Sequence, residues 1–144
     1  MYTAVFSIII LVLAGLSPAQ APQKKVIYPP GAKPGGNWSY GILADRTLYV
    51  SGMGGEDASG KLPVTFEAEV QQSLNNIEAV LKAAGMSRDD VVSVQVYLTD
   101  GATFQRMNTV YSAFFKDPRP TRTTVIVAGL VGPGHIEITA TSRK

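Results

Sequence analysis

The sequence predicts an α+β domain in which two helices pack on one face of a mixed β-sheet. Its apolar residues follow strand, strand, helix, strand, helix, strand, strand periodicity along the chain. Helices of the predicted length can cover one face of such a sheet, which gives a layered architecture. The 144 residues, 45% apolar and 17% charged, suit a single globular domain. A sheet covered on one face only also predicts self-association through the other face.

The first 21 residues have the composition of a secretory signal peptide. No charged side chain occurs from Met1 to Gln23, and the stretch from Ala4 to Leu16 is almost entirely apolar. Because a membrane-spanning helix needs about 20 apolar residues, a cleaved leader is favoured and no stable membrane span is expected. The mature protein is then periplasmic or secreted. An uncleaved anchor stays open as the alternative.

Residues 22–37 are rich in proline and glycine and predict an irregular lead-in, so the folded domain is expected to cover residues 38–144. Its first elements are two short strands over residues 40–43 and 47–51. The residues between them, 44–46, form a plausible hairpin turn.

Apolar residues at spacings of four and three predict helices over residues 66–84 and 104–114. Gly85 follows the first helix, and Pro118 stops the second pattern. Between the helices, apolar residues alternate with polar ones over residues 91–99. This alternation predicts a strand whose buried face carries Val92, Val94, Val96 and Leu98.

Two charges, Arg122 and Glu137, fall inside β-type runs near the C-terminus, separated by a Gly-Pro-Gly turn. A guanidinium can hold a carboxylate through two parallel hydrogen bonds, and a carboxylate can orient a water or carry a proton. The pair therefore suggests a site for a small carboxylated molecule. The alternative is a cross-strand ion pair on a solvated sheet face.

Composition excludes several kinds of chemistry. The chain has no cysteine and one histidine, His135, so it cannot form a thiolate nucleophile, a disulfide or an ordinary Cys/His zinc site. A metal-independent mechanism is left, and we expect no organic cofactor either. His135 follows a glycine at the start of a strand, where a turn-edge role without catalysis is expected. The net charge is only +2 and the basic residues form no stripe along the sequence, so nucleic acid is not the expected partner.

Four sequence blocks resemble a known family when taken in order. They are FEAEVQQSLNNIEAVLKAAGMSRDDVVSVQVYLTD, FQRMNTVYSAFF, RPTRTTVIVAGL and HIEITA. Over about Trp38 to Ser142 the chain resembles the RidA/YjgF family of reactive-intermediate deaminases. The resemblance implies a chorismate-mutase-like fold and a homotrimer around a barrel-type core, with sites in the clefts between subunits. It also implies hydrolysis of 2-imino or enamine acids, such as 2-aminoacrylate or 2-iminopropionate, to 2-keto acids and ammonia.

The resemblance also implies roles for individual residues. Arg122 matches the arginine that holds the substrate carboxylate, and Glu137 matches the acid that positions the hydrolytic water. Further positions match residues that line or contact the ligand, namely Ser51, Gly52, Asn108 and Thr124.

Trp38 falls where the family usually has a tyrosine. Its indole can still line the cleft and donate one hydrogen bond. Tyr40 lies two residues further on, which in a strand places it on the same face.

Two other functions remain as alternatives to catalysis of imine hydrolysis. The same cleft could serve a non-catalytic module that binds or senses small carboxylates. An endoribonuclease, a name that some relatives carry, is less favoured because of the modest charge and the single histidine.

Overall fold

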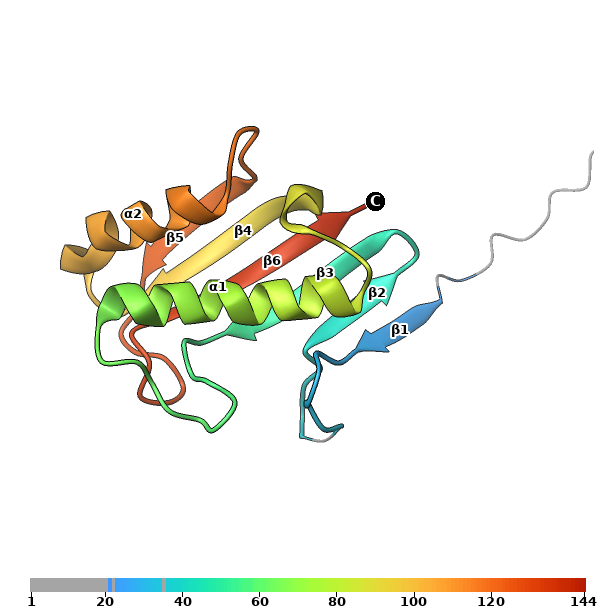
Figure 1. Cartoon of the computed structure of the whole chain (residues 1–144), viewed down its shortest axis with the longest axis horizontal. Helices are drawn as coiled ribbons and strands as arrows, with labels where there is room; N and C mark the ends of the chain where they lie inside the picture. The colour runs from blue at the N-terminus through green and yellow to red at the C-terminus, as the bar shows by residue number, and fades with distance from the viewer. Residues whose placement is uncertain (1–20, 22, 35) are drawn as a thin grey trace, which may run out of the picture.

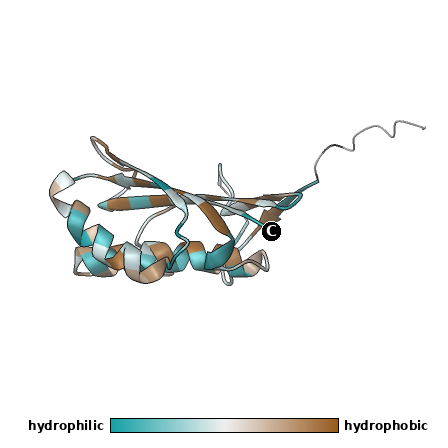
Figure 2. Cartoon of the chain, turned by 90° about the horizontal axis from the view of Figure 1, so that it is seen from above, coloured by the Kyte–Doolittle hydropathy of each residue, from teal (hydrophilic) through white to brown (hydrophobic). Residues whose placement is uncertain are grey.

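The computed structural model describes residues 21, 23–34 and 36–144, and they form one mixed sheet with two helices on one side (Figures 1 and 2). The predicted α+β class is confirmed. Short 3₁₀ turns at Arg88–Asp90 and Gly101–Thr103 precede β4 and α2. The main elements are β1 (Lys24–Ile27), β2 (Gly41–Ala44), β3 (Thr47–Met53), α1 (Phe66–Ala83), β4 (Val91–Leu98), α2 (Phe104–Phe114), β5 (Thr121–Ile126) and β6 (Ile136–Arg143).

The six strands lie in the order β1-β2-β3-β6-β4-β5. All neighbours are antiparallel except β4 and β5, which are parallel because α2 carries the chain back between them. The last strand in the sequence, β6, therefore lies in the middle of the sheet. β1 and β5 form its two edges.

Both predicted helices are confirmed. Thr65 caps α1 by accepting a hydrogen bond from the Ala68 N–H, and Gly85 follows its end with a φ of 71°. Arg106 of α2 forms a bidentate ion pair with Glu67 of α1. The apolar stripes of both helices pack on the sheet, and the largest fully buried side chains include Leu48, Leu74, Ile77, Leu81, Leu98, Met107, Ile136 and Ile138.

The expectation of an irregular lead-in is wrong for Lys24–Ile27, which form β1 and pair with β2. Ile27 is only 3% exposed and belongs to the core. The strand escaped prediction because it has four residues, begins with two lysines and is followed by two prolines. The folded part therefore begins before Trp38.

The predicted buried face of β4 is correct except at Val92. The pairing of β4 with β6 shifts by one residue between Val91 and Ser93, which is a β-bulge. The bulge buries Val91 and leaves Val92 48% exposed. Alternation in the sequence cannot show where such an extra residue enters a ladder.

The predicted signal peptide, residues 1–21, lies outside the described residues except for Ala21. Across the part of the chain that the structure does describe, no helix combines the length and apolarity that a membrane crossing requires.

Candidate active site

Glu137 lies on the face of the sheet that the helices leave open. Its neighbours in β6, Ile136 and Ile138, are fully buried beneath the helices. Because successive side chains of a strand point to opposite faces, the Glu137 carboxylate points away from α1 and α2. Its register partner in β4 is Tyr97.

Gly52 of β3 lies directly beneath the Glu137 carboxylate. A Cβ atom built on Gly52 would be 2.1 Å from Glu137 Oε1, closer than any real side chain can approach. The pairing of β3 with β6 is irregular between Val50 and Met53, at the place where Gly52 lies. The absence of a side chain there therefore lets the carboxylate lie over β3.

Ser51 and Trp38 line the same cavity as this carboxylate. The Ser51 hydroxyl donates to the Ser39 carbonyl at 2.6 Å, and the Ser51 N–H donates to the Tyr40 carbonyl at 3.0 Å. The rings of Trp38 and Tyr40 pack at 4.7 Å between centroids, with Trp38 56% exposed. The segment before β2 is thus fastened to β3 and presents two aromatic rings to the cavity that Glu137 also lines.

A cavity of about 860 Å³ opens over these groups. Glu137 is its acidic group on the sheet, and the chain after β5 supplies an apolar wall through Leu130 and Val131. Its remaining walls include Trp38, Tyr40, Ser51, Gly52, Met53, Pro29 and Pro30. We call this cavity the acidic half-site.

Arg122 lies on the other face. In the parallel pairing of β5 with β4 it is in register with Val94, which is buried beneath the helices, so its side chain also points to the helix side. The guanidinium carbon lies 4.6 Å from the ring centroid of Tyr111 and 5.7 Å from that of Phe104. Such cation–π contacts hold a guanidinium in place without neutralising it. Within the described residues, Arg122 makes no salt bridge.

A smaller cavity of about 370 Å³ lies next to this guanidinium and is lined by Asn108, Tyr111, Ser112, Arg119, Pro120 and Arg122. Burial raises the pKa of the Tyr111 phenol, while the charges of Arg122 and Arg119 act in the opposite direction. We call this cavity the basic half-site. It contains a fixed positive charge, an amide and a phenol.

Thr124 follows two residues after Arg122 on the same face of β5, in register with the buried Val96. It does not line the smaller cavity. Its hydroxyl and that of Tyr111 are buried and have no hydrogen-bond partner among the described residues.

A cross-strand ion pair between Arg122 and Glu137 is therefore wrong. β4 lies between their strands, and the two side chains leave the sheet on opposite faces. The structure brings Trp38, Ser51 and Gly52 together with Glu137, and it brings Asn108 together with Arg122. Within one chain, the two groups cannot bind the same small molecule.

Sequence reasoning missed one buried carboxylate, Glu69 in the first turn of α1. It is 2% exposed and accepts hydrogen bonds from the backbone N–H of His135 at 2.6 Å and of Ile136 at 3.3 Å. Its other oxygen lies 2.8 Å from His135 Nδ1. The signal in the sequence is that Glu69 precedes Ser73 by one helical turn, so that two polar residues lie on the same side of the helix. This signal is weak, because an acidic residue in the first turn of a helix is explained equally well by the helix dipole. In the described residues, no cluster of three potential metal ligands occurs.

Comparisons with known proteins identify the family. The family described as Endoribonuclease L-PSP matches residues 30–144. The 2-iminobutanoate/2-iminopropanoate deaminase of Bos taurus is 42% identical over 107 residues, which cover 73% of this chain and 78% of that protein. The human protein of the same name is 40% identical over the same shares of the two chains.

Solved structures agree with the sequence match. RidA from an Antarctic Psychrobacter species superposes with a TM-score of 0.79 at 34% identity, covering 83% of this chain and 99% of that one. Escherichia coli TdcF with bound serine superposes with a TM-score of 0.76 at 32% identity, covering 84% and 99%. The chain therefore belongs to the endoribonuclease L-PSP family, which is the RidA/YjgF family that its sequence blocks resemble.

Proposed function

We propose that this protein hydrolyses small 2-imino acids to 2-keto acids and ammonia, at sites that two protomers build together. The observation that carries the proposal is the separation of the two half-sites. The acidic half-site carries Glu137 on one face of the sheet, and the basic half-site carries Arg122 on the other. A site that uses both needs the acidic half-site of one protomer and the basic half-site of its neighbour.

Known relatives support the reaction class and the size of the ligand. The proteins from Bos taurus and Homo sapiens are named as deaminases of 2-iminobutanoate and 2-iminopropanoate. The related TdcF structure holds serine, a small molecule that also carries a carboxylate next to a nitrogen-bearing carbon. A 2-imino acid matches serine in both size and carboxylate position.

In this proposal Arg122 binds the substrate carboxylate. Its planar guanidinium can donate two parallel hydrogen bonds to the two carboxylate oxygens. The contacts with Tyr111 and Phe104 fix the guanidinium before the ligand arrives, which lowers the entropic cost of binding. The bound carboxylate then sets the direction in which the imine carbon points.

Glu137 acts on the water. Its carboxylate accepts a proton as the water oxygen bonds to the carbon of the protonated imine, and the C=N electron pair moves to the nitrogen, which becomes an amino group. Glu137 returns this proton to the amino group, which leaves as ammonia while the new hydroxyl gives its own proton to solvent and becomes the carbonyl of the keto acid. No electrons are transferred, and the only co-reactant is water. Gly52 leaves the space that the carboxylate occupies.

We propose a homotrimer as the assembly, in line with the family resemblance. The sheet face opposite the helices is uncovered in the single chain (Figure 2). The strand residues near its centre are mostly uncharged and include Tyr49, Gln95, Tyr97, Thr139 and Thr141. A face of this composition suits packing against other copies of the chain.

Turnover of an imine generated in solution tests the proposal. An amino-acid oxidase produces 2-iminopropionate from alanine, and the release of pyruvate and ammonia is followed with and without the protein. We expect Arg122→Ala and Glu137→Gln each to lose activity by at least about 100-fold while remaining folded. Wild-type turnover no faster than buffer would refute the enzymatic function. If pyruvate still bound in that case, a module that binds small carboxylates would be supported instead.

We further propose that residues 1–21 direct export, on the basis of their composition alone. Mass spectrometry of the mature protein should find an N-terminus created by cleavage near Ala19 or Ala21. Recovery of intact Met1 in the cytosolic fraction would overturn this assignment.

A further inference from the structure

Three polar side chains interrupt the apolar face with which α1 packs on the sheet. They are Glu69, Ser73 and Asn76, at spacings of four and three that place them on one side of the helix. Each reaches backbone outside the helix. This polar stripe, as we call these three residues, has no place in the mechanism above.

Two residues of the polar stripe hold the loop that follows β3. Ser73 donates from its hydroxyl to the Met53 carbonyl at 2.8 Å. Asn76 donates from its amide to the carbonyls of Gly54 and Glu56, both at 3.0 Å. These three bonds fix the chain just beyond Gly52, where it forms one wall of the acidic half-site.

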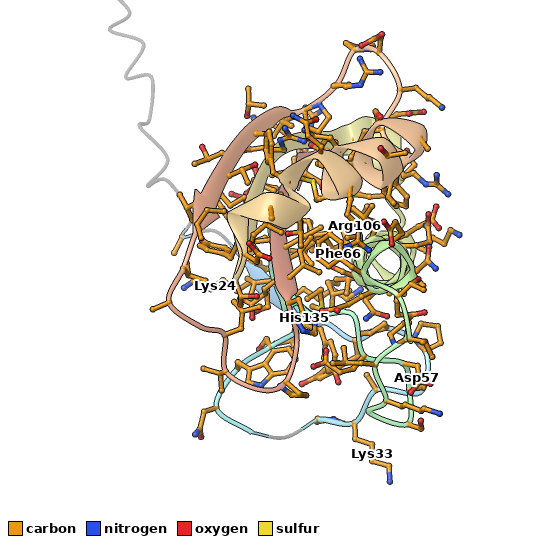
Figure 3. All side chains as sticks on the ribbon, turned by 90° about the vertical axis from the view of Figure 1, so that its left-hand side faces the viewer. Lys24, Lys33, Asp57, Phe66, Arg106 and His135 are labelled. Atoms are coloured by element: carbon orange, nitrogen blue, oxygen red, sulfur yellow. The ribbon has the colours of Figure 1, made fainter. Side chains whose placement is uncertain are left out.

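Glu69 holds the start of β6, which also lines the acidic half-site. Its Oε1 accepts from the N–H groups of His135 and Ile136, and its Oε2 lies 2.8 Å from His135 Nδ1. Figure 3 shows His135 close to the start of α1. Ile136 is the first residue of β6, and Glu137 is the next.

Glu69 also contacts the loop that follows β3. A Cβ atom added to Gly55 would lie 2.3 Å from Glu69 Cγ, so the loop passes directly over this side chain. A carboxylate that is only 2% exposed is tolerated there because hydrogen-bond donors surround it. Glu69 therefore contacts both the loop that follows Gly52 and the start of β6, which carries Glu137. Through these two contacts, one side chain sets the spacing of Gly52 and Glu137.

We propose that Glu69 is a positioning residue for Glu137. Its carboxylate fixes the start of β6, so that the Glu137 carboxylate keeps its place over Gly52 and beside the cavity. The inference rests on the proposed imine hydrolysis and adds a residue to it that touches no substrate. A misplacement of about 1 Å in a reacting group can cost about 100-fold in rate, so loss of this anchor affects catalysis.

Kinetics of variants in the first turn of α1 test the proposal. Glu69→Ala should lower kcat by about 10- to 100-fold and leave KM within about twofold, because the basic half-site that binds the carboxylate is intact. Glu69→Gln keeps an oxygen that accepts from the His135 N–H, so it should restore most of the lost kcat. Glu67→Ala is the matched control, since Glu67 lies in the same turn and pairs with Arg106 away from the cavity. It should match the wild type.

Three kinetic outcomes would overturn the proposal. They are a wild-type kcat in Glu69→Ala, an equal loss of kcat in Glu67→Ala, and a rise in KM without a change in kcat. If Glu69→Ala does not fold, Glu69→Gln is compared with the wild type instead, and because it keeps only one of the two carboxylate oxygens that contact His135, its kcat should still be lower at unchanged KM. A Glu69→Gln variant identical to wild type in that case would also overturn it.

Amide hydrogen exchange separates this inference from the proposed function. Exchange at Ile136 and Glu137 should accelerate in Glu69→Ala and not in Glu67→Ala, whether or not the protein turns over imines. If wild type hydrolyses no imine but this difference appears, the anchor stands and the enzymatic function fails. The positioning role alone fails in a different case. In that case the wild type is active and Glu137→Gln is inactive, but Glu69→Ala keeps both its activity and its amide protection.

Discussion

Arg122 and Glu137 leave the sheet on opposite faces, with β4 between their strands. In one chain, the guanidinium lies under α2 and the carboxylate lies over Gly52. Any reaction that needs both groups therefore needs two chains.

Mixed assemblies should recover activity from two inactive variants. Arg122→Ala chains keep a working acidic half-site, and Glu137→Gln chains keep a working basic half-site. When the two are unfolded together and refolded at equal amounts, roughly a quarter of the sites should combine the two intact halves. Imine hydrolysis by the mixture measures this directly.

The control for mixing is Arg122→Ala refolded with the double variant Arg122→Ala/Glu137→Gln, which has no intact basic half-site to offer and should stay inactive. If the first mixture also stays inactive, although mixed oligomers are present, the two-chain site is wrong.

Gly52→Ala should abolish turnover without unfolding the protein. The added Cβ would lie 2.1 Å from Glu137 Oε1, so the carboxylate must leave its position. We expect kcat to fall by at least about 100-fold while the circular dichroism spectrum is unchanged. Gly129→Ala is the matched control, because a Cβ at Gly129 meets no atom within 4 Å. Full activity in Gly52→Ala would show that the observed carboxylate position is not the working one.

Ile27→Ala should destabilise the fold by about 2 to 4 kcal/mol, as expected for a buried isoleucine shortened to alanine. Its neighbour Val26 is 40% exposed, so Val26→Ala should cost less than about 1 kcal/mol. Urea denaturation of both variants provides the comparison. Equal midpoints would mean that β1 contributes nothing to the core.

The ion pair between Glu67 and Arg106 should stabilise the protein in a defined pH range. The hydrogen bonds from Arg106 lower the pKa of Glu67 from 4.5 to about 2. Because the folded-state pKa is the lower one, the stabilisation is fully present above about pH 4.5 and is lost as the pH falls towards 2.

The difference in urea midpoint between wild type and Glu67→Gln should therefore be largest near neutral pH and disappear across this acid range. Both side chains are about half exposed, so 1 M salt should also reduce the difference. A difference that is independent of pH would contradict the assigned ion pair.

The sequence predicted the parts of the fold that depend on local spacing. The apolar repeat predicts the range of α1, and the proline after α2 predicts where that helix ends. Both predictions agree with the helices in the structure. The alternation around Glu137 also predicts correctly that it points away from its buried neighbours. The resemblance of the sequence blocks to a known family was confirmed as well.

The relative placement of Arg122 and Glu137 could not be predicted in this way. Nearly all residues around Arg122 are β-branched, so their pattern does not show which face of β5 is buried. The insertion of β6 between β3 and β4 depends on pairing between strands far apart in the chain. Glu69 was missed for a related reason, since its hydrogen-bond partners lie 66 and 67 residues away.

The opposite placement of the two half-sites has a consequence for how activity depends on protein concentration. Under the proposed assembly, an isolated chain has every side chain it needs and still cannot catalyse the reaction. Specific activity should then decrease on dilution, as subunits dissociate. A compound that occupied the open sheet face would inhibit the enzyme without ever entering the substrate cavity.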